Sequence, residues 1–260
     1  MARKSAKQHK LETAVARIHA RFGSRSLTLG RPPAAMEAPL AGGAPVIPHI
    51  PTGFPELDDA LCIGGLPRGA ICEIAGLPTS GKTTLALKFL AQAQAGGGQA
   101  AYVDQARYFD GDYAYRCGVD LSRLLVGAPY GLDETLATTE ALVRSESLAA
   151  LVFDAMDDLV SDSRAASQLA SCLHRLSASL SRSGTVLLVL HASSEASASV
   201  AVAYHAAVRL QVVRERWLRR HGDIRGYKAR VEVLKNRLGP AGRAVTIAIE
   251  FNGTVRGNGL

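Results

Sequence analysis

Short apolar runs alternate with segments of helical spacing through most of this chain. The apolar runs cover residues 70–75, 100–104, 148–154 and 185–191, and the helical segments cover residues 84–93, 110–118, 132–145 and 163–183. Apolar runs of this length, flanked by turn residues, are typical of strands buried on both faces. Strands that alternate with helices are joined by right-handed crossovers, which makes neighbouring strands parallel. The pattern therefore predicts an α/β fold, with a mostly parallel central sheet and helices on both of its faces.

The last third of the chain has a different pattern. Residues 207–213, 229–235 and 244–250 alternate between apolar and polar side chains and are separated by turn residues. A period of two is typical of strands that have one face in the core and the other in water. We therefore expect an antiparallel C-terminal extension of the sheet.

The first 45 residues predict an appendage. Residues 10–22 carry one apolar stripe at helical spacing, residues 26–29 are a candidate short strand, and residues 31–45 have the Pro, Gly and Ala content of a linker. The stripe consists of Leu11, Val15, Ile18 and Phe22. We therefore expect a helix–strand appendage at 1–30, a linker at 31–45 and a compact domain at 46–260. The appendage packs either on its own domain or on a neighbouring copy, and the pattern allows both.

Composition limits the class of protein. A chain of 260 residues with 47% hydrophobic side chains can bury one full α/β core. No apolar run reaches the length of a membrane-spanning helix, and the basic N-terminus is not followed by the apolar segment of a signal peptide. The four cysteines form no CxxC pair and no metal-binding spacing, so we expect reduced thiols and a cytoplasmic location.

The net charge of +7 favours an acidic partner such as nucleic acid, although solubility alone explains it equally well. Residues 214–230 are one basic stretch and contain cations interleaved with aromatic rings, a combination that suits single-stranded nucleic acid through phosphate contacts and base stacking. The alternative is a solvated hairpin whose tryptophan packs on its own core. The candidate residues are Arg214, Arg216, Trp217, Arg219, Arg220, Arg225, Tyr227, Lys228 and Arg230.

Residues 76–83 fit the pattern GxxxxGK[ST], placed between an apolar strand and a helical segment. The glycines allow the backbone to curl around an anion, and the helix N-terminus adds the positive end of its dipole. We expect Lys82 to reach the β- and γ-phosphates of a nucleoside triphosphate and the Thr83 hydroxyl to ligate Mg²⁺. The candidate phosphate-binding residues are Gly76, Thr79, Ser80, Gly81, Lys82 and Thr83.

The strand at 148–154 ends in a carboxylate, Asp154. An apolar strand with an acid at its end, at this distance after a phosphate-binding loop, is the second motif of nucleotide-binding proteins. We therefore expect Asp154 to hold Mg²⁺ through water. The acids that follow closely at 157, 158 and 162 are expected to form a solvated turn.

Taken together with further segments, these motifs make the chain resemble the core of the bacterial RecA recombinase family. The resemblance lies in residues 10–30, 50–61 and 64–69, in Glu73 before the loop, and in residues 113–120, 206–210 and 233–237. It spans almost the whole chain and stops near Leu260, so we expect the small C-terminal domain of the family to be absent. It implies that the appendage docks on an adjacent subunit, which would make the apolar stripe an oligomerisation surface.

The resemblance also implies roles for single residues. It places ATP and Mg²⁺ at Gly76, Gly81, Lys82, Thr83, Thr84 and Asp154. It assigns adenine contacts to Asp110 and Tyr113, the latter as a stacking ring, although Tyr113 is equally well explained as a core aromatic residue on a helix. It makes Lys235 and Arg237 the paired cations that reach the γ-phosphate of a neighbouring subunit.

The departures from the family pattern concern hydrolysis. Ala106 occupies the position of the glutamate that orients the attacking water, and Ala192 occupies that of a glutamine that senses the γ-phosphate. Alanine can neither accept a proton nor orient water, and we do not expect Asp104 or Gln105 to compensate. His191 is either a substitute sensor or, by the simpler interpretation, a core histidine. The two DNA-binding loops of the family are short here, at 157–163 and 193–199.

These features favour an ATP-binding accessory protein of the DNA damage response with weak or absent hydrolysis. It resembles the ImuA proteins, RecA paralogues that accompany translesion polymerases in bacterial mutagenesis cassettes, which implies RecA, a polymerase or single-stranded DNA as partners. Two alternatives are kept. The first is a competent DNA-dependent ATPase and recombinase, and the second is a switch of the same fold that uses ATP to set its assembly state without DNA.

Overall fold

The computed structural model describes residues 13, 15–17, 20–21, 46–154, 160, 162–192, 197–221, 223–251 and 255–256. The chain divides into two compact units, Met1–Val46 and Ile47–Leu260. In the first unit the described residues before Val46, Val15 among them, are helical. The rest of the predicted stripe (Leu11, Ile18 and Phe22), the strand at 26–29, the linker at 31–45, the acids at 157 and 158, and the loop residues 193–196 lie outside the described residues.

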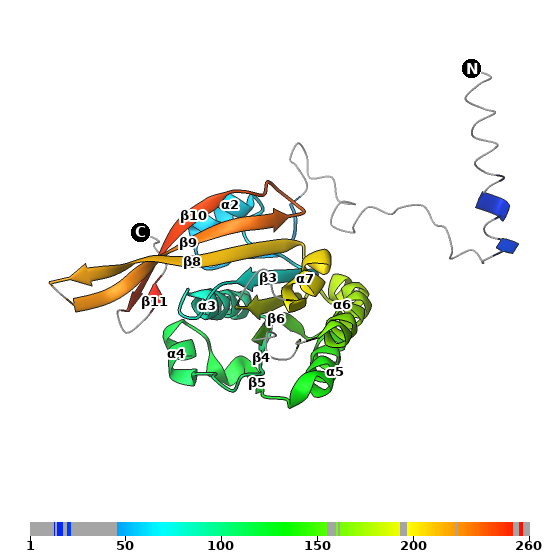
Figure 1. Ribbon diagram of the computed structural model, residues 1–260, viewed down its shortest axis with the longest axis horizontal. Helices are drawn as coiled ribbons and strands as arrows, with labels where there is room; N and C mark the ends of the chain where they lie inside the picture. Colours follow the sequence, from blue (N-terminus) through cyan, green and yellow to red (C-terminus); the bar gives the residue numbers. More distant parts are fainter. Residues whose placement is uncertain are drawn as a thin grey trace, which may run out of the picture. The chain divides into compact units, whose positions relative to one another are not determined.

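The second unit is built on a nine-stranded mixed sheet (Figure 1) with the strand order β11-β10-β9-β8-β3-β7-β6-β4-β5. Neighbouring strands are parallel from β8 through β3 to β5 and antiparallel from β8 to β11. The parallel part consists of β3 Ile71–Ala75, β4 Gln99–Asp104, β5 Leu124–Gly127, β6 Leu148–Asp154 and β7 Val186–His191. The antiparallel part consists of β8 Val208–Arg220, β9 Asp223–Asn236, β10 Ala244–Phe251 and β11 Val255–Arg256. The predicted parallel sheet with an antiparallel extension is therefore confirmed.

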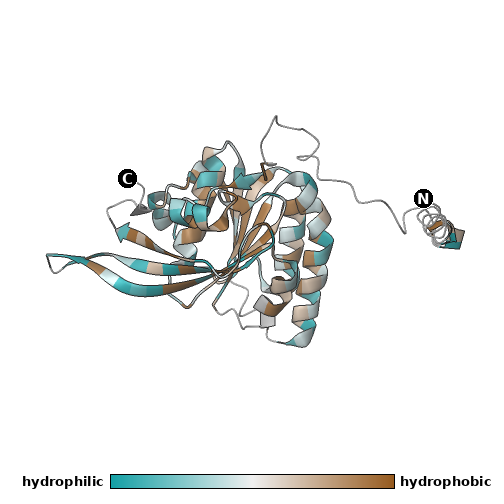
Figure 2. Cartoon of the chain, turned by 90° about the horizontal axis from the view of Figure 1, so that it is seen from above, coloured by the Kyte–Doolittle hydropathy of each residue, from teal (hydrophilic) through white to brown (hydrophobic). Residues whose placement is uncertain are grey.

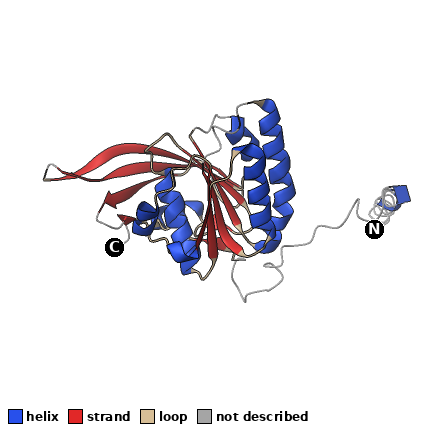
Figure 3. Ribbon diagram, turned by 90° about the horizontal axis from the view of Figure 1, so that it is seen from below, coloured by secondary structure: helices blue, strands red, loops and turns tan. Residues whose placement is uncertain are grey.

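Helices cover both faces of the sheet, as Figure 3 shows. One face packs against α3 (Lys82–Ala95), with α2 (Pro55–Leu61) and α4 (Gly111–Arg116) in the same apolar cluster. The other face packs against α5 (Gly131–Arg144), α6 (Ser163–Ser183) and α7 (Ser197–His205). The remaining elements are a 3₁₀ turn at Leu121–Arg123 and a small sheet of β1 (His49–Ile50) and β2 (Leu66–Pro67).

The central strands are apolar throughout because both of their faces are buried. In β6, Leu151 points into the cluster with α5 and α6, and Val152 points into the cluster with α3, and both are fully buried. Figure 2 shows the same division, with hydrophobic strands at the centre of the unit and mostly hydrophilic residues toward the end of β8 and β9. No helix among the described residues is both long enough and apolar enough to span a bilayer.

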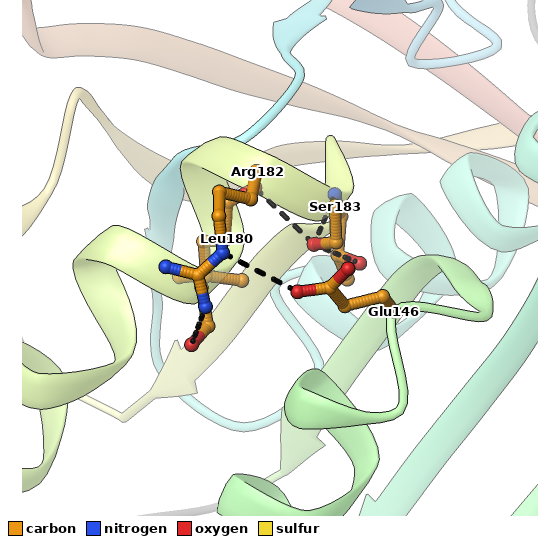
Figure 4. A network of polar contacts seen from close by, with 6 residues as sticks. Glu146, Leu180, Arg182 and Ser183 are labelled. Atoms are coloured by element: carbon orange, nitrogen blue, oxygen red, sulfur yellow. Dashed lines mark hydrogen bonds and ion pairs between the residues drawn. The ribbon is translucent and has the colours of Figure 1, made fainter.

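The C-terminal turn of α6 is joined to the turn that precedes β6 (Figure 4). Arg182 Nε lies 3.4 Å from Glu146 Oε1, and the Ser183 hydroxyl donates to the Leu180 carbonyl oxygen at 3.2 Å. Glu146 has a φ of 53°, in the left-handed region. These contacts lie at the amino ends of the parallel strands, whereas the candidate site lies at their carboxyl ends.

Three elements differ from the sequence-based expectations. Strand β5 was not predicted. Helix α7 begins at Ser197, inside the segment 193–199 that we expected to be a loop. The basic stretch 214–230 is the outer part of the β8–β9 hairpin, and its strands extend beyond the expected 207–213 and 229–235. The two strands pair out to Arg220 and Asp223, with register shifts between Arg214 and Arg216 and between Leu218 and Arg219.

Candidate functional site

The phosphate loop, residues 76–83, connects β3 to α3 as predicted. Gly81 immediately precedes α3 and has a φ of 110°, a backbone conformation that residues other than glycine rarely adopt. At Gly76 a Cβ atom would lie 2.5 Å from Ser80 Oγ and 2.7 Å from the Val212 carbonyl oxygen. Both glycines are therefore required by geometry. The first amide groups of α3 lack partners within the helix, so this end of α3 favours an anion.

Two carboxylates lie beside the phosphate loop at the ends of neighbouring strands. Asp104 of β4 and Asp154 of β6 are paired in register, and Asp104 accepts a hydrogen bond from the backbone N–H of Phe109 at 2.8 Å. The Tyr102 hydroxyl donates to Asp154 Oδ2. Burial, and then the Asp154 charge, raise the pKa of Tyr102 far above its usual value, so this hydroxyl stays protonated and oriented toward the carboxylate.

These residues line one cavity of about 370 Å³. Its walls include Lys82 and Thr83 from the loop and Asp104 and Asp154 from the strands. A hydroxyl and a carboxylate are ligands that suit Mg²⁺, which also keeps several waters and substrate phosphates in its shell. Among the described residues no group of three or more His, Cys, Asp and Glu side chains could hold a metal ion. Thr83 and Asp154 therefore fit a cation that enters with phosphates, not one bound by protein alone.

Both alanines that depart from the family pattern line this cavity. Ala106 follows β4 and Ala192 follows β7, and each presents a methyl group where the resemblance implies a polar side chain. Gln105 accepts a hydrogen bond from the Thr135 hydroxyl at 3.0 Å, which holds its amide toward α5. The His191 side chain is fully buried, as the core-histidine interpretation expects. Of the carboxylates that line the cavity, Asp104 is therefore the one nearest in sequence to Ala106, the position of the missing glutamate.

Asp110 and Tyr113 are held by contacts within the site. Asp110 caps α4, since its carboxylate accepts from the Tyr113 backbone N–H at 3.0 Å. The Tyr113 hydroxyl lies 2.6 Å from Thr84 Oγ1 at the start of α3. Burial raises the pKa of Tyr113, so its hydroxyl stays neutral. Asp110 lines the first cavity, and Tyr113 lines both this cavity and a second one.

A second cavity, of about 340 Å³, also lies at the start of α3. It shares Lys82, Thr83 and Tyr113 with the first cavity, and we refer to the two cavities together as the cleft. Its remaining walls come from the phosphate loop, from α3 and from β8 and β9: Thr79, Gly81, Thr84, Arg214, Trp217 and Tyr227.

The prediction that Tyr227 belongs to a nucleic-acid surface is wrong. The residue is only 6% exposed, and its hydroxyl lies 3.5 Å from Thr84 Oγ1. A Cβ atom on Gly81 would lie 2.9 Å from the same hydroxyl. The Tyr227 ring therefore packs beneath the phosphate loop and is not presented to nucleic acid. Trp217, 42% exposed, meets this ring edge to face at 5.9 Å between centroids.

The other cations of the stretch line both strands of the β8–β9 ribbon, which we define as residues 214–230. Arg216 lies directly opposite Lys228 in register, a pairing of like charges that destabilises a sheet unless an anion lies nearby. Near the end of the ribbon a cavity of about 630 Å³ is lined by Leu218, Arg219, Arg220, His221, Arg225 and Glu250. Arg230 is also exposed, opposite Val213.

Lys235 and Arg237 lie at the end of β9, and neither lines the two cavities at the start of α3. The Lys235 ammonium donates to the Ala203 carbonyl oxygen at 2.6 Å, and Arg237 donates to that of Tyr204 at 2.6 Å. These are carbonyl groups in the last turn of α7, where cations are favoured. Burial, and then the neighbouring arginines, lower the pKa of Lys235.

The contribution of the ribbon to this cleft was not predicted from the sequence. Arg214, Trp217 and Tyr227 wall the second cavity, although they lie more than 130 positions after the phosphate loop. No local pattern carries this contact, since it depends on β8 pairing with β3 and on a register shift between Arg214 and Arg216.

Comparison with known proteins agrees with this architecture. A family model described as the RecA N-terminal domain matches residues 9–256. Protein RecA of Chloroflexus aggregans is 35% identical over 269 residues, covering 95% of this chain and 74% of that protein. Protein RecA of Caulobacter vibrioides is 35% identical over 269 residues, covering 94% and 73%. Protein RecA of Frankia casuarinae is 35% identical over 276 residues, covering 96% and 76%. The chain belongs to the RecA family.

Proposed function

We propose that this protein binds ATP with Mg²⁺ in the cleft around the start of α3. The observation that carries the proposal is the convergence of Lys82, Thr83 and Asp154 on one cavity, at the end of a strictly glycine-dependent loop. Lys82 would contact the phosphates, and Thr83 and Asp154 would hold the cation, which supplies charge neutralisation when bound. The Tyr113 ring and Asp110, which line the same cleft, would contact the base.

We further propose that hydrolysis is slow and that the protein acts as an accessory factor in the DNA damage response. Ala106 and Ala192 support this, because both methyl groups line the cavity in which water would be activated. Removing a positioned general base typically costs about 10²- to 10⁴-fold in rate. An ImuA-like accessory role would use the ATP-bound state to engage RecA, a translesion polymerase or single-stranded DNA, without strand exchange.

The exposed cations of the ribbon support contact with nucleic acid. Arg216 opposite Lys228, and the cavity lined by Arg219, Arg220 and Arg225, place positive charge along one protruding element. We propose that these side chains and Lys228 and Arg230 bind the phosphates of single-stranded DNA. Arg219→Ala with Arg220→Ala should weaken binding and reduce the salt slope by about one per lost phosphate contact.

We propose that the residues before 46 promote assembly, with the helix and strand of 1–30 joined by the linker 31–45 to the ATP-binding domain 46–260. Support comes from the apolar stripe Leu11, Val15, Ile18 and Phe22. Substituting Val15 and Ile18 together by Asp should lower the oligomeric state measured by light scattering with ATP.

The test of the ATP proposal is equilibrium binding of a fluorescent ATP analogue with Mg²⁺. Lys82→Ala should abolish binding, and Arg144→Ala, which removes an exposed cation of α5, should not change it. Steady-state ATPase assays with single-stranded DNA, run beside an active Protein RecA, should show little turnover. Turnover at the level of that recombinase, lost in Lys82→Ala, would overturn the accessory role. A pull-down with RecA and with a translesion polymerase tests the partners.

A competent ATPase is kept as a second candidate because of Asp104, whose carboxylate lines the phosphate cavity. If Asp104 positions water, Asp104→Asn should abolish turnover while nucleotide affinity is retained. An assembly switch without DNA is the third candidate. It predicts ATP-dependent oligomers, no DNA binding at physiological salt, and no effect on binding when Arg219 and Arg220 are neutralised.

A further inference from the structure

One contact joins the β8–β9 ribbon to the phosphate loop. Arg214 Nη1 donates to Thr79 Oγ1 at 3.0 Å and lies 3.4 Å from the Thr79 carbonyl oxygen. The guanidinium carbon of Arg214 lies 4.4 Å from the centroid of the Trp217 ring, in cation–π range. The guanidinium group is thus held from one side by an aromatic ring and directs its donors at a single residue of the loop.

Thr79 is the residue of the loop whose backbone most needs support. Its φ is 65°, in the left-handed region, which is rare for a β-branched side chain. Such a conformation costs free energy and persists only when surrounding contacts impose it. Thr79 comes two residues before Gly81, whose φ is 110°. The direction of the chain at Thr79 therefore decides how the following amide groups enter α3.

We infer that Arg214 is a positioning residue of the nucleotide site. It holds Thr79 in the left-handed conformation and so pre-organises the phosphate loop for a triphosphate. The inference rests on the proposed ATP binding, but it concerns a different interaction, because Arg214 acts through Thr79 and not on the cation or the phosphates. Trp217 has a supporting part, since its ring fixes the guanidinium.

Arg214 also lines the second cavity, so a direct contact with the nucleotide is the competing explanation. A substitution at Thr79 separates the two. Glycine adopts positive φ without strain, so in a Thr79→Gly background the loop no longer needs the guanidinium. A direct contact between Arg214 and nucleotide would be unaffected by that change.

The experiment is a double-mutant cycle read by the Kd of the fluorescent ATP analogue. Arg214→Ala should weaken binding about tenfold, equivalent to about 1.4 kcal/mol, and Trp217→Ala should weaken it less. The affinity of Thr79→Gly alone is the reference for the second half of the cycle, and in that background Arg214→Ala should add no further loss. Arg144→Ala is the matched control for a lost positive charge.

Amide hydrogen exchange of residues 76–84 without nucleotide provides a readout that does not depend on binding. Arg214→Ala should accelerate exchange in this segment while thermal unfolding changes little. Lack of ATP binding by every variant, with this acceleration present, would refute the proposed function but would still support the part of the inference by which Arg214 holds Thr79. Unchanged exchange in Arg214→Ala, or a tenfold loss of affinity from Arg214→Ala that persists in the Thr79→Gly background, would overturn the inference.

Discussion

Glu73 forms the most deeply buried ion pair among the described residues, on the strand that leads into the phosphate loop. Its side chain is 1% exposed, and that of Arg209, directly opposite in the register of β3 and β8, is 18% exposed. Arg209 Nε donates to Glu73 Oε2 at 2.5 Å and Arg209 Nη2 donates to Glu73 Oε1 at 3.3 Å. We predict that Glu73→Gln destabilises the protein, because it replaces the carboxylate of this buried pair with a neutral amide while the guanidinium keeps its charge.

Removing one partner of a buried pair typically costs about 3–5 kcal/mol. The lower end of this range is expected because Arg209 retains some access to water. In a domain of this size each kcal/mol lowers the unfolding temperature by about 2–4 °C, so a loss of about 3 kcal/mol corresponds to about 6–12 °C. Replacing both residues, as in Glu73→Gln with Arg209→Met, should recover part of the loss, because the half-buried guanidinium charge is then removed as well.

Urea denaturation followed by circular dichroism measures this free energy directly. Glu146→Gln is the matched control, since the pair of Glu146 and Arg182 is 48% and 63% exposed and surface pairs contribute less than about 1 kcal/mol. A loss below about 1 kcal/mol in Glu73→Gln, or a double variant less stable than the single one, would refute the argument.

Three other predictions concern single side chains. Burial raises the pKa of the Asp58 carboxyl to about 6, although the hydrogen bond from the Thr52 backbone N–H opposes this shift. Between about pH 4 and pH 6 the folded protein therefore keeps a proton that the unfolded chain has lost. The free energy of unfolding should consequently fall as the pH rises from about 4 to about 6. In Asp58→Asn this part of the slope should vanish from urea midpoints, and an unchanged slope would contradict it. Tyr113→Phe should keep ATP-analogue affinity within about threefold while Tyr113→Ala loses about tenfold, since stacking is worth about 1–3 kcal/mol; equal losses would exclude stacking. Ala106→Glu should raise ATP turnover at least about tenfold in a coupled assay, whereas Ala106→Gln should not.

The sequence was sufficient for the parallel core because its strands are buried on both faces. Continuous apolar runs that end at Ala75, Asp154 and His191 predict buried strands. The phosphate-binding pattern of residues 76–83 depends on local spacing alone, so it could also be recognised. The role of Asp110 as a helix cap was not predicted, although it depends on a local contact with the backbone of Tyr113.

The elements that were missed lack such local signals. Strand β5 has only four residues and lies at the edge of the sheet, where Leu125 and Val126 remain exposed. Helix α7 has apolar residues on all sides, so it shows no helical period. In the ribbon, charged side chains interrupt the alternation of apolar and polar residues that predicts a strand. The contact between Arg214 and Thr79 joins residues 135 positions apart, so no local pattern indicates it.

The placement of Trp217 has a practical consequence. The chain contains one tryptophan, and it stands at the wall of the second cavity, half in water and in contact with Arg214. All tryptophan emission of the protein therefore originates from that single place. The protein carries its own optical reporter, and unlabelled ligands entering the cleft can be titrated by its spectral shift or by the protection of the indole from acrylamide quenching.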